Sequence, residues 1–273
     1  PMNISSFTFL GHAGDATIPV GYGFAYVQFH RDMNGVLYYK TRVHVHENAH
    51  AEGEYAVGLH RYSVSTGEWT ELGGLAPTTH GNVAIYKSVF WEDNGQWWET
   101  QPPDHSDSFY QSSYNGLSID RDNNLHFCFS INNITDNKDS TETIYWKSTD
   151  GGETFERADG TVISAPVRAS GSADVGDIVG ANGRYGGDAW AGVHWDGKPI
   201  IVYTDYTDQS SANPNSPPQT RLYQSGGTWG AAIDHPYSSS GPGSGVGDGN
   251  DYIITYWAIN NSTFSGRLYR TRG

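Results

Sequence analysis

One hairpin pattern recurs along the chain, and it limits the folds that the chain can adopt. In residues 23–46, 116–131 and 190–203, an alternating apolar segment meets a short polar turn and is followed by a second such segment. Alternation of period two around a tight turn predicts a pair of antiparallel strands. The chain has 34 Gly and 12 Pro and only 17% charged residues, a balance that excludes a helical bundle.

Each hairpin is followed by a segment that ends in a Gly turn and an aromatic residue. These segments cover residues 59–69, 145–155 and 222–229. Hairpin and segment together predict a four-stranded antiparallel meander, and its repetition predicts an all-β fold, a β-propeller. A blade cannot bury both faces alone, so neighbouring blades must stack. An irregular β-sandwich is the alternative interpretation.

We expect about four blades, in a single propeller domain over residues 1–273. The segment Val83–Trp98 is either part of its own blade or a long insertion. Two stretches rich in Ser, Pro and Gly, Ser210–Pro218 and Ser238–Gly249, are predicted to be loops of that domain.

Charge and composition exclude several classes of partner. The net charge is −14, whereas binding to nucleic acid needs a basic surface. No apolar run approaches the roughly 18 residues of a membrane helix, so we expect no membrane partner. Acidity and a low Lys content favour a secreted or periplasmic protein. The single cysteine, Cys128, cannot form an internal disulfide.

Two motifs point to a family. Ser148–Phe155 (STDGGETF) resembles the Asp-box S-x-D-x-G-x-T-W, a structural turn between outer blade strands, with Phe155 in place of Trp. Tyr26–Arg42 resembles the hairpin Y-x-x-F-x-x-D-x-x-G-x-L-x-x-x-x-R of the BNR-4 group of propellers. The turn at Asp120–His126 and the stretch Tyr145–Phe155 also fit that group. The resemblance covers residues 20 to 230.

Within that group the chain most resembles the ulvan lyases, which have seven-bladed propellers. The resemblance implies that the complete protein has seven blades and that this chain holds part of the ring, with N-terminal blades missing. It also implies cleavage of a sulfated algal polysaccharide by β-elimination beside a uronic acid. The resembling lyases use a further His ahead of the hairpin. Only His12 precedes Tyr26 here, in surroundings that lack the motif.

The required chemistry can be argued from residue types. Elimination beside a uronate needs a group that neutralises the carboxylate, a base for the adjacent C–H and an acid for the leaving oxygen. Arg42 suits the first task because guanidinium binds a carboxylate bidentately. Tyr26 suits proton transfer if a nearby cation lowers its pKa from about 10. If Tyr26 lies opposite Arg42, both share one face of the hairpin; a shift of one residue separates them.

Two residues of one expected strand could share a metal ion. His126 and Cys128 are two apart, so they lie on one face of a strand, and thiolate with imidazole favours zinc. The resembling lyases carry a structural zinc near the Arg hairpin, and by that resemblance His46, His126 and Cys128 are its ligands here. His44, His30 and His105 are candidates for a fourth ligand. A buried free Cys beside a half-exposed His is the alternative.

Substrate binding is assigned to aromatic residues. Tyr86 and Trp97 are predicted to stack on sugar rings, although such residues also pack between blades. The expected partner is an acidic polysaccharide. A glycan-binding propeller without catalysis and a propeller glycoside hydrolase remain alternatives.

Overall fold

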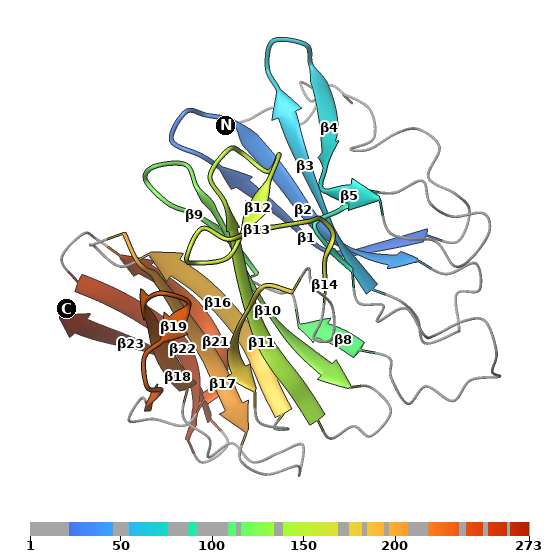
Figure 1. Ribbon diagram of the computed structural model, residues 1–273. Helices are drawn as coiled ribbons and strands as arrows, with labels where there is room; N and C mark the ends of the chain where they lie inside the picture. Colours follow the sequence, from blue (N-terminus) through green and yellow to red (C-terminus); the bar gives the residue numbers. More distant parts are fainter. Residues whose placement is uncertain are drawn as a thin grey trace, which may run out of the picture.

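The computed structural model is a succession of antiparallel β-sheets (Figure 1). It describes residues 22–45, 55–75, 87–91, 109–112, 116–133, 139–168, 175–181, 185–193, 197–206, 218–234, 239–247, 251–260 and 263–272. Within these ranges the regular structure is all strand, and no helix is long and apolar enough to span a membrane.

The first blade has the predicted four-stranded meander, in the order β1-β2-β3-β4. Its strands are β1 (Tyr22–Arg31), β2 (Leu37–Val45), β3 (Tyr55–Ser63) and β4 (Glu68–Leu72). The turn between β1 and β2 forms because the amide of Val36 donates to the Asp32 carboxylate, while Gly35 adopts φ +87°. Glycine adopts this left-handed conformation without steric cost.

The segment Val83–Trp98 was expected to be a separate blade or an insertion, and its described part joins the first two blades. The segment contains β6 (Lys87–Ser88) and β7 (Phe90–Trp91). Strand β6 pairs with β5 (Gly74–Leu75), and β7 pairs with β14 (Val167–Arg168). Strand β7 pairs antiparallel with β3 of the first blade and parallel with β14, which lies in sequence between β13 and β15 of the second blade. The segment therefore ties two blades by backbone hydrogen bonds.

The next two sheets repeat the meander. The second blade comprises β8 (Phe109–Ser112), β9 (Leu117–Ile119), β10 (Leu125–Asn133), β11 (Asp139–Ser148), β12 (Phe155–Glu156), β13 (Val162–Ile163) and β15 (Asp177–Ala181). The third comprises β16 (Tyr185–Val193), β17 (Pro199–Tyr206), β18 (Pro218–Ser225), β19 (Thr228–Trp229) and β20 (Ile233–Asp234). All three predicted hairpins and their following segments are confirmed, and the fold is a β-propeller.

A fourth sheet corrects one prediction. It contains β21 (Ser239–Gly247), β22 (Asp251–Asn260) and β23 (Thr263–Arg272). Residues 238–249 were predicted to form a loop, but 239–247 form an edge strand that pairs with β22 and has irregular register on both sides of Pro242. Proline and glycine are tolerated at an edge strand with bulges because the ladder there is already interrupted.

Two apolar cores lie between blades. The first joins blades one and two, and its centre is Trp146, whose ring stacks on Phe127 at 5.3 Å and on Phe90 at 5.5 Å. The second joins blades two and three and includes Cys128 and Tyr145. Strand β10 supplies both cores because its alternate residues face opposite sides.

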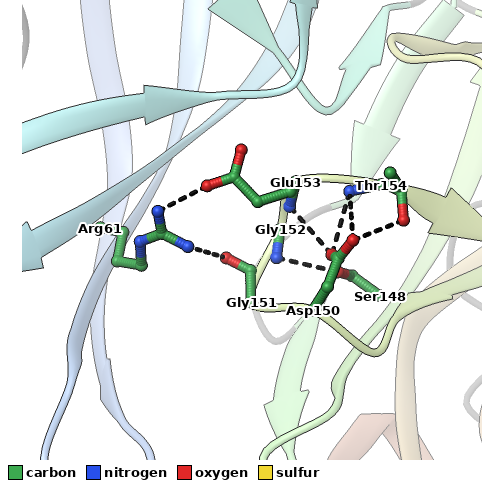
Figure 2. Close-up of polar contacts among 7 residues, drawn as sticks. All are labelled: Arg61, Ser148, Asp150, Gly151, Gly152, Glu153 and Thr154. Carbon is green, nitrogen blue, oxygen red and sulfur yellow. Dashed lines mark hydrogen bonds and ion pairs between the residues drawn. The ribbon is translucent and has the colours of Figure 1, made fainter.

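The Asp-box is a structural turn between β11 and β12, as predicted, and it also docks on the first blade (Figure 2). Asp150 accepts hydrogen bonds from Ser148 and from the amide and hydroxyl of Thr154. Partial burial alone would raise the pKa of Asp150, but these hydrogen bonds outweigh it and hold the pKa below its usual range. Arg61 of β3 reaches across to the Gly151 carbonyl at 3.2 Å and the Glu153 carboxylate at 2.5 Å.

We expect Arg61→Ala to lower the free energy of unfolding by about 1–2 kcal/mol, because it removes a charged hydrogen bond between blades. Glu153→Gln is the matched control, since it removes only the ion pair with a half-exposed carboxylate, worth less than about 1 kcal/mol. Urea denaturation of both variants measures the difference. Equal losses in the two variants would show that the bond to the Gly151 carbonyl contributes nothing.

Candidate functional site

The hairpin that carries the predicted catalytic residues contains a β-bulge. Arg42 pairs with Ala25, and Lys40 pairs with Gln28, so β1 has one residue more than β2 between these two pairs. Tyr26 lies in this bulge and is not directly opposite Arg42, which corrects the register considered from the sequence. Tyr26 follows Ala25, the partner of Arg42, so the two predicted residues lie on paired strands one register position apart.

Between the bulge and the β1–β2 turn, a polar cluster lies on the face of the hairpin that packs against the second blade. Lys40 is fully buried, donates to the Gln28 side-chain oxygen at 3.2 Å and lies 5.4 Å from the centre of the Phe129 ring. His30, which pairs with Tyr38, lies beside it. Burial and the Lys40 charge lower the pKa of His30 to about 4, so this imidazole is neutral at pH 7.

A second polar cluster lies between blades two and three, around His126. Its Nδ1 is 2.7 Å from the Tyr145 hydroxyl, and its Nε2 is 3.1 Å from the Asp120 carboxylate. Burial alone would raise the pKa of Asp120, but hydrogen bonds from His126 and Asn124 outweigh burial and lower this pKa to about 2. The three side chains form one buried hydrogen-bonded chain from the β9–β10 turn to β11.

Cys128 follows His126 on β10, and its surroundings are apolar. The thiol is fully buried in the core shared with Tyr145, Ala189 and Ala191, and burial raises its pKa well above the usual range. A zinc ligand needs a free lone pair on imidazole and a deprotonated thiol. As described, His126 and Cys128 therefore do not fit a zinc site, because Tyr145 and Asp120 occupy both ring nitrogens.

The described residues contain no group of three His, Cys, Asp or Glu side chains placed to hold a metal ion. The third predicted ligand, His46, lies outside them, so zinc binding stays a prediction. Elemental analysis of protein purified without chelators decides it. One zinc per chain, lost in Cys128→Ser together with thermal stability, supports the site. Metal-free protein of unchanged thermal stability contradicts it.

Several other predicted residues also lie outside the described parts of the chain. They include the predicted sugar-stacking residues Tyr86 and Trp97, and also His12 and His105. For Tyr26, Arg42 and His44 the structure describes the backbone position on β1 or β2.

Among the residues of these clusters, Lys40 and Tyr145 were not singled out from the sequence. Lys40 carried a usable signal, since a cation two residues before Arg42 on an alternating strand occupies the same face of the backbone as position 42. Tyr145 carried none, because its contact with His126 depends on the pairing of β10 with β11, which local sequence does not specify.

Asp177 is a buried carboxylate at the edge of the second blade. It is 7% exposed and accepts a hydrogen bond from the Ala158 amide at 2.7 Å. Burial raises its pKa to about 6, so the folded state holds this proton more tightly than the unfolded chain does. The resulting stability is complete below about pH 4 and is lost as the pH rises through 6.

We therefore expect Asp177→Asn to stabilise the protein at pH 7.5, by about 2–3 kcal/mol for a shift of about two pKa units. At pH 4 the variant and the parent should have nearly equal free energies of unfolding, since both carry a neutral acceptor for the Ala158 amide. Urea denaturation at the two pH values measures this difference. A stability difference that does not change with pH would contradict the assignment.

Comparison with known proteins places these features in context. The chain resembles two solved structures of one polysaccharide lyase, described as an ulvan lyase. One has TM-score 0.51 and 11% identity, and the other, bound to -[GlcA(1-4)Rha3S]-, has TM-score 0.52 and 12% identity. Each match covers 91% of this chain and 56% of the lyase, so the chain spans little more than half of the lyase's length.

A third similar structure is an α-L-arabinanase of Penicillium chrysogenum complexed with arabinobiose. It has TM-score 0.48 and 15% identity and covers 92% of this chain and 64% of that one. A search of curated protein sequences finds no match. The pattern of the BNR repeat-containing family, in contrast, matches residues 12–236, more than half of the chain. The protein therefore belongs to the BNR repeat-containing family.

Proposed function

We propose that this protein is a polysaccharide lyase that cleaves a uronate-containing, sulfated polymer of the ulvan type by β-elimination. One observation carries the proposal: Tyr26 and Arg42 lie on the paired strands β1 and β2, with Tyr26 in a bulge one residue beyond Ala25, the partner of Arg42. Bulges are common beside active sites because they change the direction of a side chain.

The proposed reaction assigns a task to each residue. The Arg42 guanidinium binds the uronate carboxylate bidentately and neutralises it, which acidifies the adjacent C5–H bond. A base removes the C5 proton, the C–H electron pair forms the C4=C5 double bond, and the C4–O bond breaks. The leaving oxygen takes the bond pair and a proton. Tyr26 takes part in this acid–base transfer.

The family and the fold support a carbohydrate-active propeller, and the substrate class is part of the proposal. A polyanion is repelled by a net charge of −14, so its binding requires a local concentration of cations. Arg42 supplies one such charge on β2. A polymeric substrate also requires the secreted or periplasmic location that the composition predicts.

The test is a paired assay on ulvan and on other polyuronates. Elimination should produce new ultraviolet absorbance from the unsaturated uronate together with new reducing ends. Reducing ends without absorbance would identify a glycoside hydrolase. Binding without reducing ends would identify a glycan-binding propeller. Either of these outcomes overturns the proposed function.

A further inference from the structure

We infer that Lys40 is a positioning residue, because its side chain holds the β-bulge in which Tyr26 lies. The bulge is bounded on β1 by Ala25 and Gln28, whose partners on β2 are Arg42 and Lys40. At the Gln28–Lys40 pair, the two strands are joined by a side-chain hydrogen bond in addition to the backbone pairing. Lys40 Nζ donates to Gln28 Oε1 at 3.2 Å. Lys40 is thus tied across the strands at the point where the register changes.

The burial of Lys40 shows that this contact is costly to maintain. Its side chain is fully buried between the first two blades, and a buried ammonium loses its hydration. The Phe129 ring of β10 compensates in part, with its centre 5.4 Å from Nζ. An apolar side chain of this length would fill the same space without that cost. A role beyond packing accounts for the choice of lysine.

That role follows from what a bulge does to register. A slip of one residue between β1 and β2 moves each side chain of β1 to the opposite face of the sheet. The bond between Lys40 and Gln28 disfavours such a slip on one side of Tyr26, and Phe129 of the second blade contacts Lys40 from the other blade. The position of Tyr26 relative to Arg42 therefore depends on a side chain that lies outside the reacting pair.

The catalytic consequence rests on the proposed lyase function, whereas the structural consequence does not. A misplacement of about 1 Å in a catalytic group costs on the order of a hundredfold in rate. Loss of the Lys40–Gln28 bond should therefore lower kcat by about ten- to a hundredfold and leave KM within about threefold, because Arg42 still binds the carboxylate.

Three variants test this inference in the full chain. Gln28→Leu removes the acceptor and keeps the size of the side chain, and Gln28→Glu keeps an acceptor for Lys40. Lys40→Met removes the ammonium group. Leu72→Ala is the control, since Leu72 is buried in the same core between blades but lies on β4 and takes no part in the bulge.

Steady-state kinetics and hydrogen exchange of the amides of residues 22–31 give independent readouts. We expect Gln28→Leu and Lys40→Met to lower kcat and to speed exchange in this strand. We expect Gln28→Glu to rescue both, and Leu72→Ala to leave kcat unchanged. The inference is overturned if Gln28→Leu exchanges like the parent, or if Leu72→Ala lowers kcat equally. If the parent cleaves no polyuronate, the proposed function fails and hydrogen exchange alone decides the role of Lys40.

Discussion

Gly73→Ala is expected to lower the free energy of unfolding by more than about 4 kcal/mol. Gly73 has φ +97°, and a Cβ atom there would lie 2.1 Å from the Ser88 carbonyl oxygen and 2.9 Å from the Val89 nitrogen. These are backbone atoms, so no side-chain rotation relieves the overlap. Strand β6 would have to move.

Movement of β6 is opposed by the hydrogen bonds that join the first two blades. The Val89 amide donates to Val57 at 2.8 Å, and the Val89 carbonyl accepts from Val167 at 3.0 Å. Gly197→Ala is the matched control, because Gly197 has φ +84° but open space around its Cβ position. Its expected cost is only the conformational one, about 1–2 kcal/mol. Equal losses in urea denaturation would refute the steric argument.

Arg42→Ala is expected to lower kcat/KM on a polyuronate by about a thousandfold, because it removes the group that stabilises charge on the carboxylate as C5–H ionises. Arg42→Lys should retain part of the activity, since it keeps the charge but loses the bidentate geometry. Tyr26→Phe should cost about a hundredfold or more, which is typical for loss of a proton-transfer group.

Tyr62→Phe is the control for these variants, because Tyr62 lies on β3 in the same sheet, beside Trp69 and away from the bulge. Circular dichroism should show the same fold in all of them. Substantial activity in Arg42→Ala, or an equal loss in Tyr62→Phe, would contradict the assigned roles.

The sequence was sufficient to predict the strands whose signals are local. The hairpin at residues 23–46 alternates with period two around a turn whose Asp32 and Gly35 specify its geometry, and the same features recur at Asp120. Residues 239–247 were missed because glycine and proline mark loops in a sequence, whereas here pairing with β22 makes them an edge strand.

The candidate site was only partly predictable, for a different physical reason. Its residues were identified by type and spacing, but their relation depends on register. One extra residue between Ala25 and Gln28 shifts Tyr26 away from Arg42, and no local signal marks that residue. The partners of His126 likewise come from a turn and from a neighbouring strand, so a pattern of alternating residues could not reveal that both ring nitrogens are occupied.

The mass of the products tests the central claim most directly. After limited digestion of an ulvan-type polymer by the full chain, β-elimination adds no water, so the masses of the two fragments of each cut sum to that of the parent segment. Hydrolysis adds one water per cut and incorporates heavy oxygen when the digestion is run in ¹⁸O-labelled water. If the protein is a lyase, it releases unsaturated fragments that carry no ¹⁸O label, and Arg42→Ala releases no fragments. Saturated, labelled fragments would contradict it.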